Sequence, residues 1–142
     1  MSTIERAIAI AAAAHEGQLD KAGAPYVFHP LRLMMRMATI EERIVAVLHD
    51  VVEDSVITFE DLEKEGFSTA VLEALESVTR RPSENYDKFV LRAAANPIGR
   101  RVKLVDLEDN CDLSRIAAPT EKDYARVEKY RRAIATINVL EV

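Results

Sequence analysis

The sequence predicts an all-α fold, and three observations lead to that prediction. Glycine is scarce, with 4 residues among 142, whereas the helix formers Ala, Leu, Glu and Arg are abundant. Apolar residues recur at intervals of about 3.6 residues along the chain, and we find no convincing pair of strands. Ser and Thr residues also stand ahead of most apolar segments, where they can cap helices. We therefore expect a single domain, residues 1–142, built as a bundle of about eight short helices.

The expected helices follow one another along the whole chain. In order, they cover residues 3–16, 30–37, 39–52, 58–66, 68–78, 83–96, 97–110 and 120–139. Capping boxes are expected for the first, third and last helix, at Ser2 with Glu5, Thr39 with Glu42 and Thr120 with Asp123. The residues expected to begin three further helices are Thr58, Ser68 and Ser83. Pro30 and Pro97 suit the first helical position, and Gly66 suits a helix end. Two Gly and two Pro predict a loop over residues 17–30.

Charge and composition exclude several classes of protein. The net charge of -5 argues against a broad surface for a nucleic-acid polymer, which needs excess Lys and Arg. No apolar run reaches the ~18 residues needed to span a bilayer. Glu5 and Arg6 lead the Ala-rich opening, so we expect a helix of the mature domain rather than a signal peptide. The single Cys111 excludes an internal disulfide, which suits a reducing cytoplasm. The oligomeric state stays open.

Ionisable residues interrupt an apolar helix at His49 and Asp50. An adjacent His and Asp in such a segment is costly unless both are paired or bind a metal. Glu53 and Asp54 follow within one helical turn, so an imidazole and three carboxylates gather in a short stretch. This much negative charge needs a cation nearby, and a divalent metal is the simplest choice. The alternative is a helix end whose acids are simply solvated.

Two more residues could complete a metal site. His29 precedes Pro30, although a lone His there is more typical of a turn. Asp106 lies in an apolar helical stretch, and its alternative is a tolerated acid on an amphipathic helix. Two His and two Asp would suit a divalent ion such as manganese and leave positions open for water and phosphate. Zinc and iron remain alternatives for the same donors.

Basic side chains in two loops could bind phosphate groups. Polyphosphate ligands need cationic donors. The candidates are Lys21 in the Gly/Pro loop, and Arg80 and Arg81, with Tyr86 close by. Arg100, Arg101 and Lys103 lead into Asp106. For each of these residues, the alternative is an ordinary solvated surface position.

Three segments of the chain together resemble one known family. They are His15–Gln18 with Lys21–Tyr26 and His29–Pro30; Leu48–Ser55; and Val102–Asp106 with Asn110. The first looks like the opening motif of RelA/SpoT-type hydrolase domains, the second like their HD and ED motifs, and the third like their VKLAD segment. The family is all-helical, binds manganese and removes the 3′-pyrophosphate of guanosine tetra- and pentaphosphate alarmones. Its small single-domain members include animal SpoT homologues, which are also associated with removing phosphate from NADPH.

The resemblance implies an HD-domain architecture and a role for each site residue. The implied metal ligands are His29, His49, Asp50 and Asp106. The implied catalytic residues, which organise or activate the attacking water, are Glu53 and Asp54. The residues implied to approach the substrate are Lys21, Asn110 and Tyr130, and Arg80 or Arg81 could hold further phosphates. No synthetase domain is expected.

Two positions depart from the family pattern. Asp20 stands where the family usually carries an Arg that packs on guanine, and Asp112 stands where it usually carries a basic residue. We therefore expect an intact metal site beside an altered base-binding side. The expected activity is metal-dependent hydrolysis of a phosphorylated nucleotide, with (p)ppGpp-like alarmones as the first candidates. Alternatives are hydrolysis of NADPH, an adenine alarmone or another nucleotide, a non-catalytic nucleotide-sensing module, and a structural domain without metal.

Overall fold

The computed structural model describes residues 2–140, and helices dominate this range. In chain order they are α1 (Ile4–Ala14), α2 (Phe28–Met35), α3 (Ile40–Leu48), α4 (Val51–Asp54), α5 (Phe59–Lys64), α6 (Thr69–Ser77), α7 (Tyr86–Ala94), α8 (Pro97–Asn110) and α9 (Glu121–Val139). Within the described range, β pairing is limited to one bridge between Leu19 and Pro25, in the loop after α1. The predicted all-α fold is confirmed.

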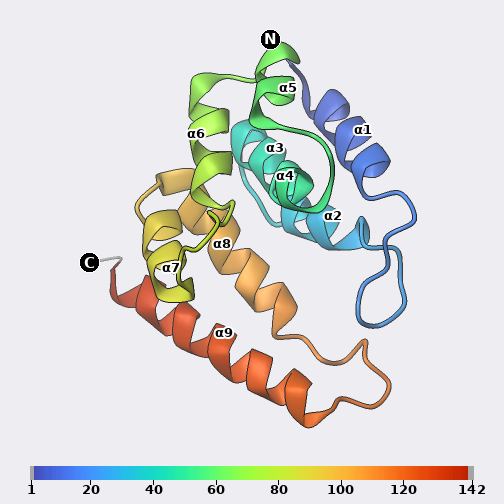
Figure 1. Ribbon diagram of the computed structural model, residues 1–142, viewed down its shortest axis with the longest axis vertical. Coiled ribbons are helices and arrows are strands. Elements are labelled where there is room, and N and C mark those ends of the chain that lie inside the picture. Colours follow the sequence, from blue (N-terminus) through green and yellow to red (C-terminus); the bar gives the residue numbers. More distant parts are fainter. Residues whose placement is uncertain (1, 141–142) are drawn as a thin grey trace.

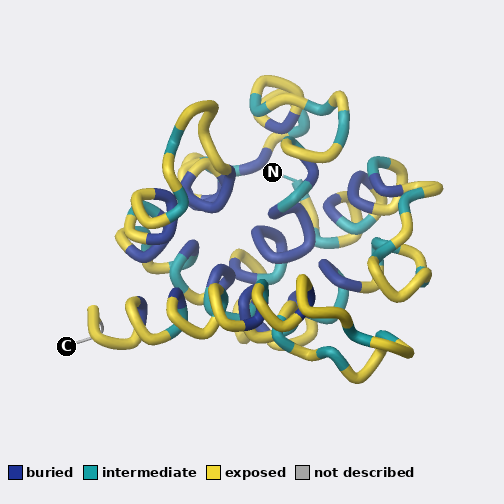
Figure 2. The backbone as a smooth tube through the Cα atoms, turned by 60° about the horizontal axis from the view of Figure 1, so that its bottom comes forward, coloured by how far each residue is buried: buried dark blue, intermediate teal, exposed yellow. Residues whose placement is uncertain are grey.

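Helix α3 lies at the centre of the molecule (Figure 1) and contacts α1, α2, α6 and α8. Its residues Val45, Ala46 and Val47 are fully buried in the main hydrophobic core. A smaller core joins α7, α8 and α9 through Val90, Leu107 and Ile137. Buried positions face the interior, whereas α9 keeps a long exposed face (Figure 2). Helix α8 takes part in both cores, so it connects the two parts of the bundle.

Most helix starts agree with the predicted caps. Thr39 and Glu42 form a capping box, Thr58 and Ser68 cap α5 and α6, and Pro97 takes the first position of α8. The cap of α8 is Asn96, which was predicted only as the end of the preceding helix. The carboxylate of Asp123 accepts from the Thr120 N–H at 2.8 Å, as predicted for α9. Gly66 has the positive φ of 92° that a helix end favours. These signals are local, which explains why the sequence reveals them.

Three predicted helix starts were wrong. The cap of α1 is Thr3, because the Ser2 N–H bonds to the Gly66 carbonyl instead. The cap of α7 is Asn85, because Ser83 adopts a left-handed φ of 64° and cannot lead into a helix. Helix α2 begins at Phe28 rather than at Pro30. Pro30 still lies in the first turn, where its missing N–H is not needed.

The helix predicted over residues 39–52 is broken at His49 and Asp50. The Nδ1 of His49 lies 2.7 Å from the Ala46 carbonyl oxygen, to which it donates. Asp50 has φ −104° and ψ 0°, at the edge of helical geometry. The chain therefore turns there and continues as the short α4, which gives nine helices over residues 2–140 instead of about eight. None of the described helices is both long and apolar enough to cross a membrane.

Candidate metal centre and adjoining pocket

The four sequence-predicted metal ligands lie close together. His29 is in the first turn of α2, His49 and Asp50 are in the break after α3, and Asp106 is in α8. Ligand atoms of His29, His49 and Asp50 lie within 4.8 Å of one another. The Oδ1 of Asp106 lies 2.9 Å from His29 Nε2 and 3.5 Å from His49 Nε2. Three packed helices thus bring two imidazoles and two carboxylates to one place.

Both imidazoles direct Nε2 toward this cluster, because other partners occupy Nδ1. A carbonyl can only accept, so His49 donates from Nδ1 to Ala46, and His29 Nδ1 lies 2.6 Å from Asp109 Oδ2. A neutral imidazole that donates from Nδ1 keeps its lone pair on Nε2, as a metal ligand must. Within the described chain, the buried His49 Nε2 makes no hydrogen bond, although Asp50 Oδ2 lies 2.9 Å away. A divalent cation would satisfy this atom and both carboxylates.

The cluster needs positive charge. Burial opposes ionisation of Asp106, but the charge of Lys103 and the close contacts with both imidazoles hold the pKa of Asp106 well below its ordinary value. Burial likewise opposes protonation of His49, yet Asp50 and Asp106 raise the pKa of His49 well above its ordinary value. The Nζ of Lys103 lies 3.4 Å from Asp106 Oδ2. The carboxylates are therefore ionised and favour either ring protons or a metal ion.

A second layer of side chains supports the cluster from the loop after α1. The Tyr26 hydroxyl donates to Asp50 Oδ2, and the Tyr26 ring lies 5.0 Å from that of the buried His15. Gln18 approaches His15 Nδ1 at 2.8 Å and donates to the Asp54 carbonyl oxygen at 2.9 Å. Sequence reasoning did not assign Tyr26 to the site, although it lies in the opening segment that resembles the family.

Glu53 and Asp54 lie on α4, immediately beyond the cluster. Both side chains are exposed, and Glu53 Oε1 accepts from the Arg80 N–H at 2.6 Å. Partial desolvation and the charge of Asp50 raise the pKa of Glu53, although the hydrogen bond from the Arg80 N–H acts to lower it. Partial desolvation and Asp50 also raise the pKa of Asp54. A carboxylate with a raised pKa is a better proton acceptor near neutral pH.

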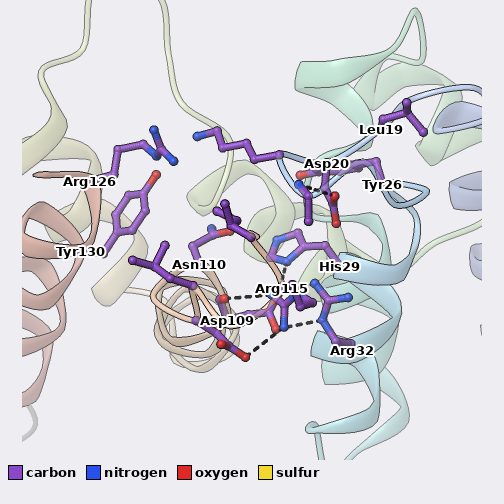
Figure 3. Close-up of a pocket in the computed structure, with 15 residues that line it drawn as sticks. Leu19, Asp20, Tyr26, His29, Arg32, Asp109, Asn110, Arg115, Arg126 and Tyr130 are labelled. Atoms are coloured by element: carbon purple, nitrogen blue, oxygen red, sulfur yellow. Dashed lines mark hydrogen bonds and ion pairs between the residues drawn. The ribbon is translucent and has the colours of Figure 1, made fainter. Parts of the chain in front are cut away.

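A pocket of about 370 Å³ adjoins His29. Figure 3 shows Arg126 and Tyr130 on one side of it, with Tyr26 and His29 on the other. Three residues predicted to bind substrate, Lys21, Asn110 and Tyr130, line this pocket. Arg126 was not predicted, although its place one helical turn before Tyr130 on α9 could have signalled it. Lys21 and Arg126 line the same pocket, and partial burial and the charge of Arg126 lower the pKa of Lys21.

The other three predicted substrate residues are placed differently. Arg80, Arg81 and Tyr86 are not among the described residues that line this pocket. Besides its N–H bond to Glu53, Arg80 donates through its guanidinium to the Glu84 carbonyl oxygen, and this group lies 5.9 Å from the Tyr86 ring centroid. Arg81 pairs with Glu76 at 3.7 Å on the surface. Tyr86 lines a separate pocket between α7 and α9.

Asp20 and Asp112, the two departures from the family pattern, both line the pocket but form their hydrogen bonds and ion pairs with neighbouring residues of the chain. One oxygen of Asp20 accepts from the N–H groups of Ala22 and Ala24, each at 2.9 Å, and so shapes the loop. Asp112 accepts from the Ser114 N–H at 2.9 Å and pairs with Arg115 at 3.0 Å. Neither carboxylate can stack on a base as a guanidinium does.

Comparisons with known proteins extend this description. No family model matches the chain. It is 36% identical over 121 residues to the guanosine-3′,5′-bis(diphosphate) 3′-pyrophosphohydrolase of Aquifex aeolicus, which covers 77% of this chain and 17% of that protein. It is 30% identical over 122 residues to the bifunctional (p)ppGpp synthase/hydrolase SpoT of Escherichia coli, covering 75% and 17%. The chain thus spans about a sixth of the length of these relatives.

A solved structure shares the fold. It is described as a metazoan ortholog of SpoT that hydrolyzes ppGpp and plays a role in starvation responses, and it superimposes with a TM-score of 0.77. The match covers 94% of this chain and 84% of that one, at 24% sequence identity. At this identity the likeness concerns the fold alone, and it agrees with the predicted all-α fold.

Proposed function

Since this chain is a relative of the RelA/SpoT-type (p)ppGpp hydrolases, we propose that it is a metal-dependent phosphohydrolase that acts on a phosphorylated nucleotide. One observation carries the proposal. Two imidazole Nε2 atoms and two ionised carboxylates converge beside a pocket that Lys21 and Arg126 also line. A purely structural helical domain has no need for such a costly group of buried charges.

The ion would be held by His29, His49, Asp50 and Asp106, and we propose manganese. Mixed nitrogen and oxygen donors suit a divalent ion of this kind, with zinc or iron as alternatives. When bound, such an ion polarises phosphate oxygens and makes water a better nucleophile. Lys103 and Asn110 both bond to the Asp106 carboxylate, at 3.4 and 3.1 Å, and so keep it turned toward the imidazoles.

The chain's own residues would then bind the substrate and move a proton. Glu53 is the proposed proton acceptor, with Asp54 orienting the attacking water. Lys21 and Arg126 would hold phosphate groups, and Asn110 and Tyr130 would contact the rest of the nucleotide. The backbone N–H of Arg80 donates to Glu53 at 2.6 Å, so the proposed role of Arg80 is to orient that carboxylate. Arg81 and Tyr86 lie outside the pocket and would contact the substrate only if it extends beyond the pocket.

The first candidate reaction is removal of the 3′-pyrophosphate from a (p)ppGpp-like alarmone, because that activity is named for the sequence relatives. One oxygen of Asp20 accepts hydrogen bonds from its own loop, and an aspartate has no guanidinium to stack on a guanine base. NADPH, an adenine alarmone or another nucleotide are therefore the alternative substrates. We further propose that the enzyme is cytoplasmic and has no membrane partner. The net charge of -5 is in keeping with a protein that does not bind a nucleic-acid polymer.

A manganese-supported screen of phosphorylated nucleotides, read by released phosphate and pyrophosphate, tests the proposal. We expect turnover of at least one nucleotide, and Glu53→Gln should lower it by about a hundredfold while manganese binding is retained. Glu60→Gln, a charge loss at an exposed position of α5, is the matched control and should behave as wild type. Unchanged turnover in Glu53→Gln would refute its role. Manganese binding without turnover of any nucleotide would favour the non-catalytic sensing module.

A further inference from the structure

We propose that Asp109 is a positioning residue of the metal centre, and that Arg32 in turn holds Asp109. Asp109 would keep the His29 ring in the tautomer and orientation that direct Nε2 to the ion. This inference rests on the proposed function, because it assigns a role at the same site. It concerns a residue that the four-ligand description leaves out.

The contacts form a chain of three side chains on the pocket wall. Asp109 Oδ2 lies 2.6 Å from His29 Nδ1, and the His29 ring is buried. Arg32 reaches both carboxylate oxygens of Asp109, from Nε and from Nη2, each at 2.9 Å. These bonds are drawn in Figure 3. Such a two-point guanidinium contact fixes the carboxylate in direction as well as in position.

Helix α8 therefore approaches His29 at both ring nitrogens. Asp106 Oδ1 lies 2.9 Å from Nε2, and Asp109, three residues further along the same helix face, lies beside Nδ1. The two nitrogens point to different sides of the ring, so Asp109 faces away from the ligand cluster and is not a fifth ligand. A carboxylate that accepts from Nδ1 makes the imidazole a stronger ligand and restricts its rotation.

The roles of Arg32 and Arg115 in the pocket follow from the same contacts. Arg32 lines the pocket, but its Nε and Nη2 donate hydrogen bonds to Asp109. Arg115 lies 3.6 Å from Asp109 and 3.0 Å from Asp112. Both cations are therefore charge-balanced by carboxylates of the pocket wall. Their contribution is to hold the wall rather than to supply free charge for phosphate.

Manganese titration of the full chain by calorimetry tests the inference. Loss of an outer partner of a metal-bound His costs about 10-fold to 100-fold in metal affinity. We expect Asp109→Asn, which keeps an acceptor but loses the charge, to weaken binding by about tenfold, and Asp109→Ala to weaken it further. The manganese affinity of Arg32→Gln should lie between the affinities of wild type and Asp109→Ala. The melting temperature of the metal-free protein reports separately on folding.

Glu108→Gln is the matched control. Glu108 is the preceding residue of α8 and pairs with Arg36 at 3.5 Å instead of with a His, so manganese affinity should not change. Wild-type affinity in both Asp109 variants would overturn the inference and leave the proposed function intact. A raised KM for the nucleotide with unchanged manganese affinity would also overturn it, because Asp109 would then be a substrate contact. Failure of the wild-type protein to bind manganese, zinc or iron would instead overturn the proposed function, and this inference with it.

Discussion

The Tyr26 hydroxyl holds one of the proposed metal ligands, Asp50, in place. It donates to Asp50 Oδ2, and its ring lies between those of His15 and His29, at 5.0 and 5.7 Å. Burial, together with the negative charge of Asp50, raises the pKa of Tyr26 above its ordinary value. The phenol therefore stays protonated at neutral pH and remains a donor. One oxygen of Asp50 is thereby held in place.

Replacing Tyr26 should weaken metal binding without unfolding the protein. Tyr26→Phe keeps the ring between the two imidazoles and removes only the hydroxyl. We expect about a tenfold loss of manganese affinity, as for other outer partners of metal ligands, measured by calorimetric titration. Tyr124→Phe, at an exposed position of α9, provides the comparison. Equal affinities for wild type and Tyr26→Phe would show that the hydroxyl does not position Asp50.

At the residue scale, the sequence revealed the groups that are expensive to bury and missed those that depend on distant contacts. His49, Asp50 and Asp106 stood out because they interrupt apolar segments. Asp109 did not, because nothing in the spacing along α8 indicates that it meets His29, 80 positions earlier. Its role becomes readable only when α2 and α8 are packed together.

At the scale of elements, the close approach of α6 and α8 depends on one glycine. Gly99 is buried in the first turns of α8, and a Cβ built there would lie 2.0 Å from Ser77 Oγ at the end of α6. That hydroxyl is itself buried and donates to the Ala74 carbonyl oxygen at 2.6 Å. Because α8 carries Asp106, the spacing of these two helices also helps to place the candidate metal centre.

A methyl group at position 99 should therefore destabilise the fold. We expect Gly99→Ala to lower the free energy of unfolding by about 1–3 kcal/mol, the usual cost of overpacking, despite the better helix propensity of Ala. Urea unfolding measures the change. In a Ser77→Ala background, where the clashing oxygen is gone, the same substitution should cost clearly less. A Gly99→Ala protein as stable as wild type would contradict this account of the α6 and α8 contact.

Element starts were predictable where the signal lies within one helical turn. Thr39 with Glu42 and Pro97 at the first position of α8 act as expected from the sequence alone. The break between α3 and α4 was not predictable from periodicity, because the apolar pattern continues through it into Val51 and Val52. There the polar contacts of His49 and Asp50 outweigh helix propensity.

At the scale of the whole molecule, the site exists because α2, α3 and α8 pack against one another. Helix α9 closes the far side of the adjoining pocket with Arg126 and Tyr130 (Figure 3). Composition and periodicity predicted the helical class but not this arrangement. The arrangement of these helices could be expected only from the order of the three motifs, through their resemblance to a known family. The proposed ligand set therefore forms in the folded chain and not in the unfolded one.

The proposed metal centre can be tested by a crystal structure of the protein crystallised with manganese, in which anomalous scattering locates the ion. We expect one strong peak bonded to His29 Nε2, His49 Nε2 and carboxylate oxygens of Asp50 and Asp106, with Asp109 still on His29 Nδ1. A peak elsewhere, or either imidazole turned away from these carboxylates in the manganese-containing crystal, would contradict the proposed metal centre.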